Sequence, residues 1–454
     1  MQQDLPVVVI GAGPTGLAAA SELDRRGLPV LVLERGDEAA TSVREWAHVR
    51  LFSPWRDLTA PAATALLEAR GWQPPSEDIH PTGAEWVRDY LAPLAAELAP
   101  VIRYRARVVG VSREGLDRVV DADRAERPFT LRLRTAASLE ERIHARAVID
   151  ASGTWTTPNP LGADGLPASG EQSAPERIGN RIPDLAQPDV RRRFSGGTTA
   201  VVGRGHSALT ALVTLSELAT ETPGTRILWV LRRSSIGDAF GGGDDDQLAA
   251  RGALGMRARA AVDAGHVRVV TGFRTAEVRT TPRGLVLVGT DAQELEPVHQ
   301  ILNLTGFRPD LSWLNELRLG LDPALQAPVQ LAPLIDPNVH SCGTVYPHGA
   351  AELAHPEPGF YLAGMKSYGR APTFLALTGY EQVRSIAAEL AGDRASAARV
   401  ELTLPETGVC SGSGIADQPQ ADTASPAAGG SCGTGCDPSP ETQPLAGSTP
   451  PRNR

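Results

Sequence analysis

Two glycine-rich segments have the residue types and spacing of loops that bind the pyrophosphate of a dinucleotide. The first contains, in order, Gly11, Ala12, Gly13, Pro14, Thr15 and Gly16. It lies between the apolar run 6–10 and a run of small residues, and Glu34 ends the next apolar run. Glycines let the backbone approach a pyrophosphate at a helix N-terminus, and a carboxylate accepts hydrogen bonds from a ribose. The segment predicts a dinucleotide site, with a purely structural glycine turn as the alternative.

The second segment has the same pattern and a different charge at the end of the following apolar run. It contains, in order, Gly203, Arg204, Gly205, His206, Ser207 and Ala208. Alanine in place of the third glycine is allowed in such loops. The next apolar run ends in Arg232 and Arg233 instead of an acid, and arginine there pairs with a 2′-phosphate. This segment favours NADPH over NADH, unless the two arginines only solvate the end of a strand.

The runs around the two loops predict two strand–helix–strand units, each the start of a parallel sheet covered by helices. The first unit has strands at 6–10 and 29–35. The second has a strand before Gly203, a helix at 209–219 and a strand at 226–233.

Other segments add to these units. Helices are predicted at 84–98 and in the run that stops at Gly392, and alternating polarity predicts an antiparallel layer from 103–114 and 128–135. Strands followed by a glycine are predicted at the ends of 146–153, 299–306 and 359–364.

The predicted fold class is α/β, with two Rossmann-like dinucleotide-binding domains, the second inserted into the first. After Pro405 the chain consists mainly of Ser, Gly, Pro, Thr and Ala, which predicts a disordered tail. The predicted parts are a first domain from 1–160 and 301–404, an inserted domain at 161–300 with a linker at 156–197, and a cysteine-containing tail at 405–454.

Composition narrows the possible partners and the location. The formal charge of −9 argues against nucleic acid, and the sequence lacks a run of 18 apolar residues and a basic segment at its start, which argues against a membrane span and a signal peptide. Four cysteines do not form a disulfide framework, so a cytoplasmic protein is expected. A single lysine, Lys366, accompanies 43 arginines, which is typical of a GC-rich coding bias. The oligomeric state is left open.

This plan resembles the flavoproteins with two dinucleotide-binding domains and, among them, the single-component flavin monooxygenases. The resemblance covers residues 5–395 and rests on the motifs GAGPTG, GRGHSA, VIDASG and ILNLTG. It implies FAD in the first domain, NADPH in the second, and O2 with a small molecule as substrates. The cofactor-binding residues expected from the motifs and the resemblance are Gly11, Gly13, Pro14, Thr15, Gly16, Glu34, Arg35, Arg44, Trp46, Val108, Gly153, Gly203, Gly205, His206, Ser207, Arg232, Arg233, Gly306, Gly364 and Thr373.

Two motifs known from related flavoproteins are absent from the sequence. A redox CxxC pair does not occur, which argues against thioredoxin reductase-like chemistry. The motif FxGxxxHxxx(W/Y/F) is also missing before Gly203, where the sequence reads FSGGTTAVVG. This second departure argues against Baeyer–Villiger oxidation and amine N-oxidation, but not against the fold.

A narrower resemblance concerns the segments 341–383 and 404–411, which look like flavoproteins encoded among bacterial arsenic-resistance genes. It implies oxidation of trivalent arsenicals, soft centres that thiolates capture. The thiols that could do so are Cys342, Cys410, Cys432 and Cys436. Alternatively, Cys342 is a small buried apolar residue and the tail thiols are inert.

The sequence therefore predicts an FAD-dependent oxidoreductase that oxidises NADPH, and favours a monooxygenase acting on a soft nucleophile. The alternatives are an NADPH oxidase or electron-acceptor reductase, and a thiol-based metalloid-sensing binding protein. No catalytic residue is assigned. No metal site is expected either, because the spacing of His340, His348 and His355 fits no common ligand pattern.

Overall fold

The computed structural model describes residues 4–135, 140–237, 239–243, 246, 248–339, 348–372 and 374–401. Two parallel sheets organise this part of the chain, and one strand of each leads into a glycine loop. The predicted disordered tail, residues 405–454, lies outside the described residues.

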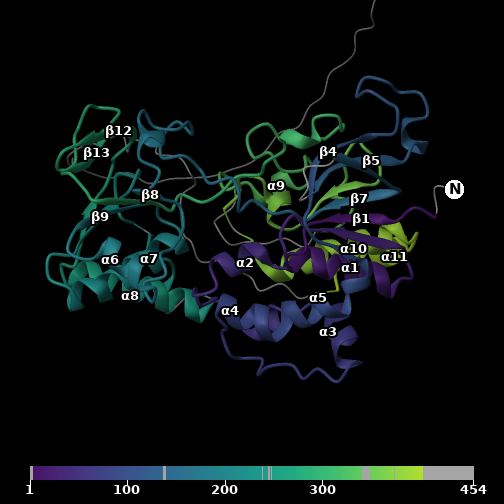
Figure 1. The fold of residues 1–454 in the computed structure, drawn as a ribbon, viewed down its shortest axis with the longest axis horizontal. Helices are drawn as coiled ribbons and strands as arrows, with labels where there is room; N and C mark the ends of the chain where they lie inside the picture. Colours follow the sequence, from purple (N-terminus) through teal and green to yellow (C-terminus); the bar gives the residue numbers. More distant parts are fainter. Residues whose placement is uncertain are drawn as a thin grey trace, which may run out of the picture. The chain divides into compact units, whose positions relative to one another are not determined.

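The first parallel sheet is built from both ends of the described chain (Figure 1). Its strand order is β15-β7-β1-β2-β3. Apolar side chains fill most positions because a parallel sheet is covered on both faces. In this order the strands are Phe360–Leu362, Ala147–Asp150, Val7–Ile10, Val30–Leu33 and Ile102–Arg103.

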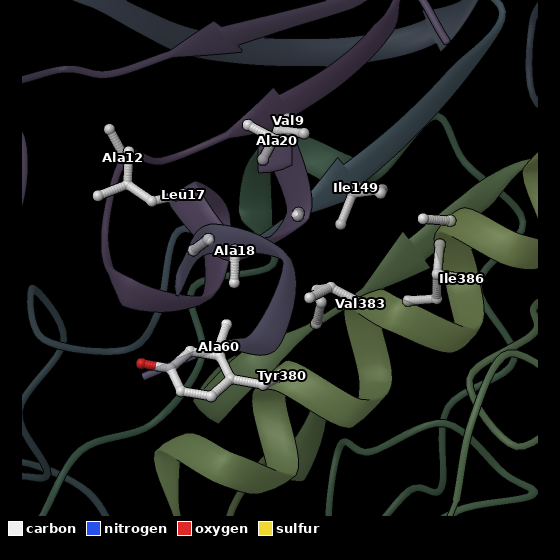
Figure 2. Close-up of a cluster of buried hydrophobic side chains, with 14 of the residues drawn as sticks. Val9, Ala12, Leu17, Ala18, Ala20, Ala60, Ile149, Tyr380, Val383 and Ile386 are labelled. Carbon is white, nitrogen blue, oxygen red and sulfur yellow. The ribbon is translucent and has the colours of Figure 1, made fainter. Parts of the chain in front are cut away.

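Helices α1 (Pro14–Arg25) and α10 (Ala376–Leu390) pack against each other beside this sheet. Small residues on α1 permit the close approach, and Ala18 and Ala20 are almost fully buried. Figure 2 shows these side chains in one cluster with Val383 and Ile386 of α10. The core thus joins segments from opposite ends of the described chain.

The second parallel sheet has the strand order β11-β10-β9-β14-β8. Its strands, in the same order, are Val267–Val270, Arg226–Val230, Thr198–Val202, Gln300–Asn303 and Ile178–Gly179. Helices α6 (Pro188–Phe194), α7 (His206–Glu221) and α8 (Ala249–Asp263) accompany it. Strand β8 and α6 fall within 156–197, the stretch predicted as a linker.

Two antiparallel layers complete the sheets. One joins β4 (Ala106–Arg113), β5 (Phe129–Thr135) and β6 (Glu140–Ala145), in agreement with the alternating polarity of the sequence. The other, β12 (Thr275–Thr281) with β13 (Gly284–Gly289), has no counterpart in the predictions.

The predicted helix at 84–98 is present in three consecutive parts. It begins at α4 (Gly83–Trp86) with a capping box, continues as a π-helical turn (Val87–Leu91) and ends as α5 (Ala92–Glu97). The remaining α-helices are α2 (Thr41–Glu45), α3 (Pro61–Glu68), α9 (Ala332–Ile335) and α11 (Arg394–Ala398). Short 3-10 turns connect several elements, at Trp55–Asp57, Ala99–Val101, Arg124–Glu126, Glu171–Ser173, Ser312–Leu314 and Gly364–Tyr368. Among the described helices, each is too short or too polar to cross a bilayer.

Candidate functional site

The first glycine loop leaves β1 and enters α1, and two of its glycines are required by the protein itself. Gly11 has a φ of +98°, and a Cβ there would lie 2.9 Å from the carbonyl oxygen of Ala151. A Cβ on Gly16 would lie only 1.9 Å from the carbonyl oxygen of Gly11. A larger residue at Gly11 would collide with the segment after β7, and one at Gly16 would push α1 away from the loop.

Gly13 is different, because nothing in the protein requires a glycine there. It caps α1 with φ −81° and ψ −175°, an extended conformation open to any residue. A Cβ on Gly13 would meet no atom within 4 Å. The open space lies at the N-terminus of α1, where unpaired N–H groups favour an anion. The cradle therefore fits a pyrophosphate that a side chain at Gly13 would displace.

Glu34 follows β2 and connects the loop to the end of the second strand. Its side chain is buried and accepts hydrogen bonds from the backbone N–H of Ala12 at 2.7 Å and of Gly36 at 2.8 Å. These bonds orient the carboxylate, and each of its oxygens keeps a lone pair for a ribose hydroxyl. The neighbouring Arg35 is exposed.

Arg44 and Trp46 lie in and after α2, close to the loop. The Nε of Arg44 donates to the carbonyl oxygen of Ala39 at 3.2 Å, and both side chains are half-buried. Val108 is buried in β4, where it pairs with Leu133 of β5.

The turn after β15 and the helix α10 close on the first loop through Thr15. A Cβ on Gly364 or on Gly379 would lie 2.8 Å from the Oγ1 of Thr15. Gly364 also has a φ of +68°. Both glycines thus allow these segments to approach the loop closely. Thr373, predicted at the start of this helix, lies outside the described residues.

The second glycine loop repeats the geometry of the first. Gly203 has a φ of +129°, and a Cβ there would lie 2.4 Å from the carbonyl oxygen of Leu304. Gly205 caps α7 with φ −76° and ψ 176°, and a Cβ there would meet no atom within 4 Å. Ala208 is fully buried at the third glycine position. The open position again lies at the N-terminus of a helix, as an anion site requires.

The side chains after Gly205 and after β10 are accessible. His206 and Ser207 are exposed at the start of α7, with the His206 ring 4.9 Å from that of Phe52. Arg232 is exposed and Arg233 is half-buried. They follow the strand β10, which pairs with β9, so both arginines lie at the same sheet edge as the glycine loop.

Gly153 and Gly306 lie where the chain passes between the two sheets. Both have positive φ values, +68° and +94°, and a Cβ on Gly153 would meet no atom within 4 Å. The two passages, 151–159 and 304–309, are paired: the N–H of Asn159 donates to the carbonyl oxygen of Gly306 at 2.9 Å.

A cluster formed by these passages and Arg181 was not predicted from the sequence. The rings of Trp155 and Phe307 are 4.8 Å apart, and the Arg181 guanidinium lies 3.7 Å from the centre of the Trp155 ring. The indole N–H of Trp155 donates to Glu45 at 2.7 Å. Burial lowers the pKa of Arg181, although Glu45 opposes this shift. The available signal was an aromatic residue close after a glycine that follows a strand, with Phe307 one residue after Gly306 and Trp155 two residues after Gly153.

Two of the three histidines singled out in the sequence are described, and both are buried. The Nε2 of His348 lies 2.9 Å from the Nε2 of Gln382. Burial lowers the pKa of His355 to about 4, so its ring is neutral at pH 7. Within the described ranges, no three His, Cys, Asp or Glu side chains are grouped to hold a metal ion. His340 and all four cysteines, Cys342, Cys410, Cys432 and Cys436, lie outside those ranges.

Comparisons with proteins of known structure agree with this architecture. A bacillithiol disulfide reductase from Bacillus cereus has a TM-score of 0.62 and 18% identity, over 86% of this chain and 99% of that one. An ornithine N-hydroxylase from Kutzneria sp. 744 has a TM-score of 0.57 and 16% identity, over 86% and 100%. A flavin-containing monooxygenase from Stenotrophomonas maltophilia has a TM-score of 0.52 and 23% identity, over 86% and 98%. At these identities the likeness shows the fold, and the predicted fold class is confirmed.

Sequence comparison identifies the family. A 44-residue segment is 52% identical to indole-3-pyruvate monooxygenase YUCCA1 from Oryza sativa subsp. japonica, but it spans only 11% of that protein and 10% of this chain. Residues 8–330, most of the chain, match the pyridine nucleotide-disulphide oxidoreductases. The chain belongs to the pyridine nucleotide-disulphide oxidoreductase family and is an oxidoreductase.

Proposed function

We propose that this oxidoreductase is a monooxygenase, which takes two electrons from NADPH and inserts one atom of O2 into a soft nucleophile. The reaction balances as NADPH, H+, O2 and substrate giving NADP+, water and the substrate oxide. When bound, FAD supplies the two-electron chemistry and the reaction with O2. The protein holds, orients and shields the reactants.

The first loop is proposed to hold FAD. The observation that carries this assignment is the open space at Gly13, which the fold leaves empty although the backbone there accepts any residue. N–H groups at the start of α1 would bind the pyrophosphate, and Glu34, already oriented by Ala12 and Gly36, would bind the ribose. Arg44, Trp46, Val108 and Gly364 stay predicted contacts of this cofactor.

The second loop is proposed to hold NADPH in the same way, with the open position at Gly205 facing the pyrophosphate. Arg232 and Arg233 lie at the same sheet edge and would pair with the 2′-phosphate. Gly153 and Gly306 would let the backbone pass close to the two cofactors. In this proposal the two nucleotides lie on separate sheets, which are joined by two passages of chain.

The sequence favours oxygen insertion over disulfide reduction. Thiol-disulfide exchange by a paired redox centre needs two neighbouring thiols, and no CxxC pair occurs in the 454 residues. The structural likeness to two named monooxygenases, an ornithine N-hydroxylase and a flavin-containing monooxygenase, is compatible with this chemistry.

For the substrate we propose trivalent arsenicals, whose soft arsenic atom would gain the oxygen. The proposal rests on the four cysteines and on the segments that resemble arsenic-resistance flavoproteins. Thiolates bind soft centres, so Cys342 and Cys410 would contribute to substrate affinity.

The experiment is a measurement of NADPH oxidation, O2 uptake and arsenic speciation in the same reaction. Arsenite or methylarsenite should accelerate NADPH oxidation, with one O2 consumed and one pentavalent product formed per NADPH. Replacing Cys342 and Cys410 by serine should raise KM for the arsenical and leave anaerobic reduction by NADPH unchanged. If neither arsenical changes the rate or binds, the arsenical proposal is wrong.

A second candidate is an electron-acceptor reductase that inserts no oxygen, which is favoured by the TM-score of 0.62 to a disulfide reductase. The same experiment separates the two functions. A reductase would consume NADPH with an added disulfide or quinone under anaerobic conditions, and would form hydrogen peroxide but no oxygenated product in air.

A further inference from the structure

Lys366 is the single lysine of the chain, and it is buried. The sequence uses arginine for its other 43 basic residues, yet it has lysine in the turn Gly364–Tyr368 that follows β15. Only 1% of this residue is exposed. A buried ammonium group is costly unless it is paired, so its partners identify what the residue does.

The ammonium group contacts three side chains from two other segments. Its Nζ lies 2.7 Å from the Oδ2 of Asp150 and donates to the Oγ of Ser152 at 3.1 Å. It also lies 4.3 Å from the centre of the Trp313 ring. Asp150 is fully buried, so the pair is isolated from water.

These partners lie at the start of the departing passage and shortly after the end of the returning passage. Asp150 ends β7, and the chain then leaves the first sheet through Gly153. Trp313 lies in the 3-10 turn Ser312–Leu314, shortly after the chain returns through Gly306. One ammonium group therefore contacts both the departing and the returning segment.

The positive charge of Lys366 also affects the pKa of Asp310, which lies in the returning segment. Burial alone would raise the pKa of Asp310, but hydrogen bonds from Ser312 and the charges of Lys366 and Arg107 lower it. The returning segment thus carries a carboxylate and an aromatic face toward the same cation.

We propose that Lys366 is a positioning residue for hydride transfer. Its contacts fix the two passages at the edge of the first parallel sheet. The two nucleotide sites lie on separate sheets, so the passages set how the donor reaches the acceptor. This inference rests on the proposed placement of FAD at the first loop and NADPH at the second.

The shape of the group explains why lysine stands there. An ammonium is compact and has three donors in a tetrahedral arrangement, so it can bind Asp150 and Ser152 while facing Trp313. A guanidinium is larger and planar, and its donors form a rigid fork. In a chain that otherwise uses arginine, we expect Lys366→Arg to disturb the passages.

The test uses the purified full chain with FAD and three variants: Lys366→Arg, Lys366→Met, and Lys366→Met combined with Asp150→Asn. The double variant removes both charges, so it does not leave a buried carboxylate unpaired. Flavin reduction is followed anaerobically with saturating NADPH and, separately, with dithionite, which needs no nucleotide site.

We expect the double variant to keep FAD and its dithionite reduction, while reduction by NADPH slows about 10- to 100-fold, as a misplacement of reactants would cause. Lys366→Arg should show the same separation. Hydrogen exchange of the FAD-free protein gives a second measurement, and protection should fall in both 151–159 and 304–313.

A matched control is Arg384→Met combined with Glu381→Gln. This buried pair lies within α10, with an N–O distance of 2.7 Å, and Arg384 also donates to the carbonyl oxygen of Ser396 in α11. In this control, the rate of flavin reduction by NADPH should not fall relative to the rate of reduction by dithionite.

The proposal is overturned if Lys366→Arg behaves as the wild type, or if the double variant reduces normally with NADPH. It is also overturned if the double variant loses FAD while the control retains it, because Lys366 would then serve flavin retention. Absence of FAD from the wild type would instead contradict the proposed function.

Discussion

The two glycine loops have nearly the same backbone and very different surroundings. In the first, Thr15 is in contact range of Gly364 and Gly379, and the acid that ends the next strand, Glu34, is buried. In the second, Ser207 and Arg232 are exposed. The protein therefore encloses one loop and leaves the other open.

Enclosure and exposure suit two different kinds of ligand. A ligand held under packed segments leaves slowly, and dissociation rates account for most differences in affinity. An open loop with accessible arginines lets a nucleotide enter and leave in each turnover. Under the proposed assignment, the same loop geometry would serve a resident FAD in one case and an exchanging NADPH in the other.

The largest expected effect comes from valine at the open glycine of each loop. Gly13→Val should fold, because the backbone and the free space accept a side chain, but it should abolish FAD retention. Gly205→Val should retain FAD and lose NADPH binding. Flavin absorbance per chain and anaerobic titration with NADPH measure the two losses.

Gly16→Val is the control for the first loop, because a Cβ there would strike the carbonyl oxygen of Gly11. It should lower the melting temperature of the FAD-free protein, whereas Gly13→Val should not. A Gly13→Val protein that retains FAD fully would contradict the assignment of the first loop.

A smaller effect is expected from the charges that follow β10. The double variant Arg232→Ala with Arg233→Ala should lose about one to three orders of magnitude in kcat/KM for NADPH, because each charge-assisted hydrogen bond to a phosphate contributes about 1.5–3 kcal/mol. The value for NADH should barely change.

Arg226→Ala provides the matched control, since Arg226 is exposed at the opposite end of the same strand. It should leave both nucleotides unaffected. Equal losses for NADPH and NADH in the double variant would show that Arg232 and Arg233 support the fold.

The smallest effect concerns acid and stability. The folded pKa of His355, about 4 because of burial, lies below its ordinary value of 6.5, so the unfolded chain binds the proton first as pH falls. The contribution of neutral His355 to the free energy of unfolding is therefore fully present above pH 6.5 and is lost as pH falls through 4. This loss is about 3 kcal/mol between pH 7 and pH 4.

Denaturant unfolding of the FAD-free protein at several pH values measures this loss. His355→Leu should remove about that much of the pH dependence. An unchanged pH dependence in His355→Leu would exclude the buried ring as its source.

Much of the fold follows from local patterns in the sequence. The glycine loops, the strands beside them and the helix 84–98 were predictable because their signals lie within a few neighbouring residues. The hairpin of β12 and β13 was missed, since its polar strand Thr275–Thr281 has only one buried face and little apolar signal.

The site was harder to predict because its contacts join distant segments. Ser152 and Lys366 are 214 residues apart, and only the strand order β15-β7-β1 brings them together. The cluster of Trp155, Arg181 and Phe307 likewise depends on how the two passages run side by side. The hydrogen bonds from Ala12 and Gly36 to Glu34 join residues that are closer in sequence. They could not be predicted because they depend on how the loop turns its backbone N–H groups.

The pairing of β7 with β15 has a consequence for synthesis of the chain on the ribosome. β15, residues Phe360–Leu362, comes after all five strands of the second sheet have been made. The inserted unit can therefore fold while the first sheet still has an unpaired edge at β7. Since β7 reads Ala-Val-Ile-Asp, that edge is apolar and open to wrong pairing until translation brings β15 to it. A slow stretch of translation just after the second sheet would lengthen this exposure and lower the yield of folded enzyme.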